Sequence, residues 1–175
     1  MKTIKTLMAA LMVTLFCFNS AKAQNKPATG AMGEGDLKTM LDNLGYDPKD
    51  APLSGNRTGY FITVKFKGQN ASMFMQISPS GSNVWSTFDM AELKPEHKDN
   101  GARLTKLLQL NQKYGPCHFY IHPNGNMLSL TRCLFNKNIT PKELREHIEE
   151  VISTATATID DWNTQTWNAP TTAQK

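Results

Sequence analysis

Residues 115–135, GPCHFYIHPNGNMLSLTRCLF, hold two apolar runs on either side of the tetrapeptide PNGN. Asn-Gly between apolar runs is the strongest short-range signal for a β-hairpin, because both central residues of the tight turn need a positive φ. A two-residue turn at Asn124 and Gly125 also sets the register. It pairs Ile121 with Leu128, Phe119 with Leu130, and Cys117 with Arg132. Apolar residues then meet on one face of the hairpin, and Cys133 points to the other face.

The same stretch contains Cys117 and Cys133, and a disulfide between them is the alternative to an unbonded pair. A three-residue loop would set the two cysteines opposite each other, but it would pair apolar Phe119 with polar Thr131. The register therefore favours unbonded cysteines, whereas an oxidising compartment would permit the bond. A thiol titration of denatured, unreduced protein decides between these alternatives.

Three further strand-like runs precede the hairpin, at residues 59–66, 72–78 and 83–90. In the first run, Tyr60 and Ile62 alternate with Phe61 and Thr63, as the residues of a half-buried strand do. The separators KGQN and PSGS have the chemistry of hairpin turns. The sequence therefore predicts an antiparallel meander before the hairpin.

Three helices are indicated by apolar residues at helical spacing. The first begins at Asp36, which can cap it, and the second covers about residues 104–114. The third has the clearest start, since Thr140 and Glu143 form a capping-box pattern. Its apolar face continues as far as Trp162.

The predicted order is helix, three strands, helix, two strands, helix, which is an α+β fold. The sheet has five antiparallel strands, a three-strand meander plus the hairpin, and the three helices cover one face of it. Strand alternation sends four aromatic residues to the other face: Phe61, Phe74, Trp85 and Tyr120. Because large exposed apolar patches usually mark contact sites, these four residues are the predicted binding surface for a protein or peptide partner. The alternative is that the second helix or the mate of a homodimer covers them.

The first 23 residues have the layout of a secretory signal peptide, with Lys2 and Lys5, an apolar run over residues 7–18, and an Ala-Lys-Ala pattern ending at Ala23. This run is shorter than the roughly 20 residues that span a bilayer. We therefore predict cleavage after Ala23, no stable membrane insertion afterwards, and a periplasmic or secreted protein. An uncleaved anchor helix is the alternative.

The rest of the chain is predicted to contain one domain, over residues 36–163. Residues 24–35 are polar and glycine-rich, which predicts a flexible lead-in, and residues 164–175 are predicted to be a disordered tail. Without the leader the chain has 16 Lys and Arg (19 minus Lys2, Lys5 and Lys22) against 15 Asp and Glu, a net charge of +1. With no basic run, nucleic acid is excluded as the expected partner.

Metal binding has little support among the histidines. His118 and His122 share a strand face but lie about 13 Å apart, too far to chelate one ion. His97 is predicted in a solvated loop, and His147, among glutamates, on the charged outer face of a helix. No metal site is predicted, and no motif requires a cofactor.

Catalysis has equally little support. A Cys/His hydrolase could use Cys117 or Cys133, because a thiolate needs a base to form near neutral pH. Neither cysteine has the flanking signature of a known nucleophile, and both lie in strand patterns. Asp160 and Asp161 are adjacent at a helix end, where successive side chains diverge. No catalytic residue is therefore predicted.

Three stretches together resemble the YbjN family of bacterial sensory-transduction regulators: GYDPKD at 45–50, LLQLNQKYGPCHFYIHPNGNMLSLTRCLF at 107–135, and TPKELREHIEEVISTATATIDDW at 140–162. The resemblance covers roughly residues 36–163, and its markers besides apolar spacing are Asn111 and the Asn-Gly hairpin. It implies a fold like that of type III secretion chaperones, with no catalytic residue to carry over. The exported start departs from the cytosolic members of the family. We expect an exported, non-enzymatic interaction module, with a small-ligand-binding or structural envelope protein as the alternative.

Overall fold

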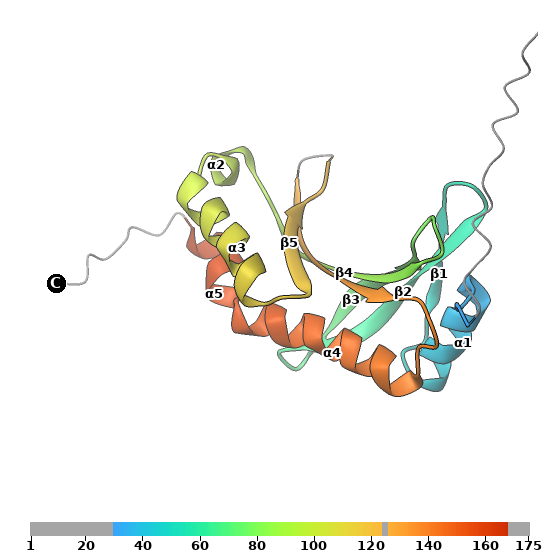
Figure 1. Cartoon of the computed structure of the whole chain (residues 1–175). Helices are drawn as coiled ribbons and strands as arrows, with labels where there is room; N and C mark the ends of the chain where they lie inside the picture. Colours follow the sequence, from blue (N-terminus) through green and yellow to red (C-terminus); the bar gives the residue numbers. More distant parts are fainter. Residues whose placement is uncertain (1–29, 124–125, 168–175) are drawn as a thin grey trace, which may run out of the picture.

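The structure, a computed structural model, describes residues 30–123 and 126–167. It contains one antiparallel sheet of six strands in the order β1-β2-β3-β4-β6-β5, with helices on one side of it (Figure 1). The strands are β1 (Lys49–Leu53), β2 (Arg57–Phe66), β3 (Gln69–Ile77), β4 (Asn83–Glu92), β5 (Cys117–Ile121) and β6 (Met127–Phe135). The helices are α1 (Glu34–Asn43), α2 (Pro95–Lys98), α3 (Gly101–Lys113), α4 (Pro141–Ala157) and α5 (Ile159–Trp162), followed by the 3-10 helix η1 (Thr164–Thr166). The α+β class and the antiparallel sheet are confirmed.

The predicted counts of five strands and three helices are wrong, because the described residues also form β1, α2 and α5. β1 reads KDAPL, and its Pro52 and Asp50 are poor strand formers, so local propensity does not indicate it. It forms because it pairs with β2, with Lys49 opposite Phe61 at one end and Leu53 opposite Arg57 at the other. α2 and α5 have four residues each, too few to leave a periodic pattern.

The first helix begins earlier than predicted, with Gly33 as its N-cap residue. Asp36 lies in the first turn, where its carboxylate accepts a hydrogen bond from the Gly33 N–H at 2.8 Å. At the other end Gly45 has a φ of 85°, and the Tyr46 N–H donates to the Leu41 carbonyl at 3.1 Å. This arrangement is a Schellman motif. It favours glycine at position 45, because the residue that follows the C-cap must adopt a positive φ.

The described structure extends beyond residues 36–163 at both ends. Met32, inside the predicted lead-in, is buried, and the Asn136 side chain holds its backbone. The predicted disordered tail begins with η1, and Trp167 is buried, with its indole N–H donating to the Asp161 carbonyl at 3.0 Å. Residues 1–29, including the predicted signal peptide, and residues 168–175 lie outside the described residues.

The hairpin has the predicted register, and the turn residues Asn124 and Gly125 lie outside the described residues. Its pairs are Cys117 with Arg132, Phe119 with Leu130, and Ile121 with Leu128. Cys117 is buried on the helix side, Cys133 is exposed on the other side, and both thiols are free. β6 also pairs with β4, which joins the hairpin to the meander.

The capping box of α4 is confirmed. The Thr140 hydroxyl accepts from the Glu143 N–H at 3.2 Å, and the Glu143 carboxylate accepts from the Thr140 N–H at 2.8 Å. The helix does not run unbroken to Trp162, because the chain leaves α4 after Ala157 and restarts as α5. At the break the Thr158 hydroxyl donates to the Thr154 carbonyl at 2.7 Å, a local bond that competes with the helical pattern.

The core lies between the sheet and the helices α1, α3 and α4. Nine strand residues that face the helices are buried: Tyr60, Ile62, Val64, Met73, Met75, Ile77, Phe119, Leu128 and Leu130. On the same face Phe66 is half-buried, and Ile121 is 40% exposed beside α3. The sheet curves, with α4 along its convex side and its concave side turned away from α4 (Figure 1). Among the described helices, none is long and apolar enough to span a membrane.

Candidate functional site

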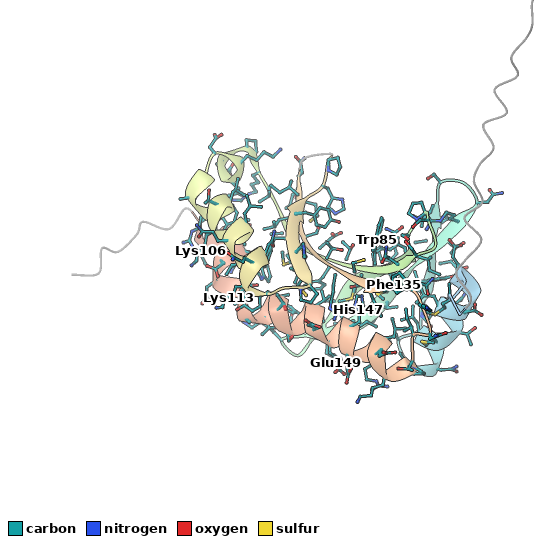
Figure 2. The ribbon with its side chains drawn as sticks, viewed as in Figure 1. Trp85, Lys106, Lys113, Phe135, His147 and Glu149 are labelled. Atoms are coloured by element: carbon teal, nitrogen blue, oxygen red, sulfur yellow. The ribbon has the colours of Figure 1, made fainter. Side chains whose placement is uncertain are left out.

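The concave side of the sheet is the candidate site, and we call it the open face. No helix of the described residues lies over it (Figure 1). Strand pairing places five aromatic residues on it: Phe61, Phe74, Trp85, Tyr120 and Phe135. Figure 2 shows Trp85 and Phe135 on this side, whereas His147 lies on the side of α4. The four aromatic residues predicted from the sequence therefore share the face opposite the helices, and their role in binding stays a prediction.

Phe61 and Phe74 form one aromatic pair of the open face. They lie directly opposite each other on β2 and β3, with ring centroids 5.1 Å apart. The Phe74 ring also covers Gly59, since a Cβ at this position would lie 2.4 Å from the tip of the ring. A glycine in a strand often marks such a close approach, and here it lets the Phe74 ring lie flat against the sheet.

Trp85, Cys133 and Phe135 lie at the middle and one end of the open face. Trp85 is half-buried and lies opposite the exposed Cys133. Phe135, opposite Asn83, is 61% exposed, compared with 47% for Phe61. The sequence analysis missed Phe135, although its spacing of two residues from Cys133 places both on one face.

Tyr120 lies near the other end of the face, within a polar cluster. Its hydroxyl lies 3.1 Å from His122 Nε2, which is also 3.1 Å from the Ser129 hydroxyl. Ser129 donates to the Asp89 carboxylate at 2.6 Å, and His122 Nε2 lies 3.4 Å from the same carboxylate. Partial burial is the main cause that raises the pKa of Tyr120. This cluster gives the face hydrogen-bonding groups and negative charge, which Glu92 extends on β4.

Two histidines lie elsewhere than the sequence predicts. His97 is in α2 rather than in a solvated loop, and it is buried with its ring 5.8 Å from that of Trp167. His147 is fully buried and faces the sheet, so its assignment to an outer helix face is wrong. His118 is exposed on the open face. Among the described residues, no three metal-ligating side chains cluster.

The contact between Ser86 and His147 looks at first like the dyad of a hydrolase, with the Ser86 hydroxyl 2.9 Å from His147 Nε2. Arg132, however, contacts His147 Nδ1 and lies 2.8 Å from Glu150. Because a guanidinium can only donate, Nδ1 accepts and the ring proton sits on Nε2, which donates to Ser86. In this tautomer His147 cannot take the proton of the serine, and Ser86 itself is fully buried. Burial and the Arg132 charge lower the pKa of His147 to about 3.

The cysteines give a similar result. Burial raises the pKa of the Cys117 thiol, so the thiolate that a nucleophile needs is disfavoured at neutral pH. Cys133 is accessible but lies opposite Trp85 in the sheet. The geometry of the described residues therefore supports binding better than a Cys/His reaction.

An apolar cavity of about 410 Å³ lies on the helix side, between α3 and the β5–β6 hairpin. It is lined by Leu104, Leu107, Leu108, Phe119, Tyr120, Ile121 and Leu128. Leu108 is 65% exposed and Ile121 40% exposed at its rim. A larger hollow of about 640 Å³, between the α1–β1 connection and α4, carries charged groups such as Lys65 and Glu149.

The comparisons with known proteins agree with this fold. The model of the YbjN family, described as "Putative bacterial sensory transduction regulator", matches residues 35–167. A solved structure of an uncharacterized protein from Methanothermobacter thermautotrophicus is 17% identical, with a TM-score of 0.55, and the alignment covers 77% of this chain and 97% of that one. YbjN from E. coli, described as "a putative transcription regulator", is 12% identical, with a TM-score of 0.52, over 74% and 92% of the two chains. At these identities the likeness concerns the fold alone. A search of curated proteins found no match.

Proposed function

The chain belongs to the YbjN family, and we propose that it is a non-enzymatic regulatory module that binds a segment of a partner protein on its open face. We further propose that the module acts in the bacterial envelope after export. The leader pattern of residues 1–23 supports the export, and the family description supports the regulatory role.

The observation that carries the proposal is an uncovered concave face with five aromatic residues (Figure 1). Aromatic residues are enriched at binding hot spots, because they bury a large area at a small cost in side-chain entropy. The concave shape suits a helix or an extended segment better than a flat protein surface. Ser, Thr and Gln side chains between the aromatic residues add hydrogen-bonding groups.

The test is peptide selection on the chain that begins at Gln24, followed by affinity measurement of the selected peptides. Every described helix and strand lies between Glu34 and Thr166, so this chain retains all of them. Trp85→Ala should weaken binding of the selected peptides by about 30-fold, equivalent to ~2 kcal/mol. Leu108→Ala is the matched control, since it removes an exposed apolar side chain outside the open face and should leave the affinity unchanged.

Thermal unfolding of the monomer separates a surface role of Trp85 from a core role. The melting temperature should change little in Trp85→Ala, because the residue is half-buried on a face without a covering helix. A variant that unfolds would place Trp85 in the core and remove the proposal.

A second candidate function is binding of a small apolar ligand in the cavity beside α3. Its volume of about 410 Å³ and its mostly apolar lining support this alternative. Leu108→Asp should abolish binding of such a ligand while leaving peptide binding on the open face intact. A ligand that still binds this variant would lie elsewhere.

A further inference from the structure

We propose that the part of β2 that β1 leaves uncovered is a second binding site, where an extended segment of a partner protein adds to the sheet as a short antiparallel strand. The segment that fits has an apolar side chain next to an acidic one. The site lies at an edge of the sheet, apart from the open face, so it goes beyond the function proposed above and does not depend on it.

β1 covers only the first part of β2, and the pairing ends with Lys49 opposite Phe61. If β1 continued in the same register, Asp47 would lie opposite Thr63. Asp47 instead has a φ of 48°, in the left-handed region that a strand does not adopt, and the chain turns away from β2. Among the described residues, no strand pairs with β2 on this side beyond Phe61.

Backbone groups of Thr63 and Lys65 point to the uncovered side. In an antiparallel strand, alternate residues exchange hydrogen bonds with one neighbouring strand and the residues between them with the other. Pro52 has no N–H, and the N–H of Thr58 opposite it donates to the Glu34 carboxylate at 2.8 Å, so Thr58 does not exchange bonds with β1. The odd-numbered residues of β2 therefore face β1, and Thr63 and Lys65 continue this set. Their N–H and carbonyl groups have no hydrogen-bond partner within the described part of the chain.

These groups border the hollow of about 640 Å³ between β2, α4 and the α1–β1 connection. Its helix side is an apolar wall formed by Tyr46, Ile148 and Ile152, of which Ile148 is buried and the other two are half-buried. Free N–H and carbonyl groups at the spacing of a strand, above an apolar wall, are complementary to an extended backbone. The opposite edge of the sheet differs, because the Asn111 amide bonds the backbone of β5 there.

The side chains around the hollow determine the chemistry of the segment. Directly opposite residues of an antiparallel pair have their side chains on the same face. A residue opposite Lys65 therefore lies beside its exposed ammonium group, which donates to Asn70 at 2.6 Å and favours an acidic neighbour. A residue opposite Val64 points to the apolar wall, where Glu149 at the rim disfavours a second acidic group. The matching segment thus alternates apolar and acidic side chains.

The position of the edge favours a segment of a partner over a second copy of this chain. The uncovered part of β2 is recessed between α4 and the α1–β1 connection. A single extended segment can enter the hollow, whereas two equally recessed edges cannot meet. The uncovered residues 62–66 span about 17 Å at ~3.3 Å per residue, so a peptide of about six residues covers them.

Amide hydrogen exchange, followed by NMR in the chain from Gln24, tests the site residue by residue. The probe is a capped peptide of about six residues in which Val and Glu alternate. Without peptide, the Thr63 and Lys65 amides should exchange quickly and the Val64 amide, which faces β3, slowly. At about 1 mM peptide, a Kd of roughly 0.1 mM slows exchange of the Thr63 and Lys65 amides about ten-fold. Slow exchange of both amides without peptide, or no slowing with it, would overturn the inference.

Variants of Lys65 separate strand addition from other binding. Lys65→Pro removes the outward N–H, which an edge position tolerates, and should abolish the slowing at Thr63. Lys65→Glu keeps the backbone and should reverse the charge preference, so that a peptide of alternating Val and Lys binds more tightly than the Val/Glu peptide. Lys113→Glu, on α3 (Figure 2), is the matched control and should keep the preference of the wild type. An unchanged preference in Lys65→Glu would contradict the proposed pairing.

Trp85→Ala distinguishes this site from the open face. The variant should bind the Val/Glu peptide as the wild type does, because Trp85 lies on β4 and does not border the hollow. If Trp85→Ala abolishes the slowing at Thr63 and Lys65, the peptide binds the open face and the inference is wrong. If the slowing persists while no selected peptide depends on Trp85, the function proposed for the open face is wrong and the edge site stands.

Discussion

His147 is an ionisable residue that is fully buried beside the positive charge of Arg132. Its ring is fully buried, it accepts from Arg132 and donates to Ser86, and its pKa is lowered to about 3. A neutral histidine in this position links α4 to β4 and β6 without adding a second positive charge beside Arg132. The His147 side chain therefore has a structural role, although a histidine in contact with a serine suggests a catalytic one.

The pH dependence of stability follows from that pKa. The unfolded chain binds a proton at His147 below the ordinary pKa of 6.5, whereas the folded chain does so only near 3. The contribution of His147 is thus complete above pH 6.5 and is lost as the pH falls toward 3. Between pH 6.5 and 4.5 the wild type should lose about 2 kcal/mol of unfolding free energy through this residue.

Denaturant unfolding of His147→Gln as a function of pH checks this prediction. The variant should be less stable at pH 7, because the bonds to Ser86 and Arg132 are weakened, but it should lack this part of the acid slope. His118→Gln, which changes an exposed histidine of the open face, should keep the wild-type slope. An unchanged slope in His147→Gln would mean that His147 is protonated in the folded protein.

The sequence contains a signal for the burial of His147 that the charge pattern hides. Position 147 is three residues after Leu144 and four before Val151, so it lies on the buried face of α4. The three neighbouring glutamates instead favour an exposed position on the outer face of the helix. Spacing predicts the burial correctly here, whereas the Arg132 partner comes from a distant strand and could not be predicted.

At the scale of the element, Asn111 explains how the edge strand β5 is protected. Its side chain donates to the Phe119 carbonyl at 3.2 Å and accepts from the Phe119 N–H at 2.6 Å. One amide thus occupies the two backbone groups that point away from β6, in the manner of a neighbouring strand. Edge strands with free backbone groups invite pairing with other chains, and α3 supplies this cover. Asn111 is one of the markers of the family resemblance in the sequence, and in the structure it covers the edge of β5.

Removal of the Asn111 amide should therefore have two effects. Asn111→Ala leaves the Phe119 N–H and carbonyl without these partners and should reduce the unfolding free energy by about 1–3 kcal/mol. It should also increase aggregation, measured by light scattering during heating, because the edge of β5 becomes available. Gln112→Ala, at the next and exposed position of α3, is the matched control. It should change the unfolding free energy by no more than ~0.5 kcal/mol and leave the light scattering unchanged. A variant as stable as the wild type would show that the amide does not protect the edge.

The whole molecule depends on features that local patterns do not contain. The runs around residues 59–66, 72–78 and 83–90 predict β2, β3 and β4 well, because alternation is a local property. The pairing of β4 with β6 joins residues about 45 positions apart, and the bulge between Asp89 and Ala91 that disturbs it has no local signature. Bulges bend and twist strands, and they contribute to a curved sheet. The aromatic residues of the open face could thus be predicted, but the concave shape that brings them together could not.

The two cysteines of the chain from Gln24 report separately on the surface and on global unfolding. Cys133 is exposed and should react quickly with a thiol reagent in the native protein. Cys117 has no exposed surface beneath α4, and burial raises its pKa, so it should react only when the molecule unfolds. In Cys133→Ser only the slow reaction should remain. Asn111→Ala should accelerate this reaction by the same factor by which it raises the equilibrium constant of unfolding. In denaturant without reductant, two thiols should titrate in the monomer. If none titrates, a Cys117–Cys133 disulfide is present, and the hairpin must shift its register so that the two residues lie opposite each other.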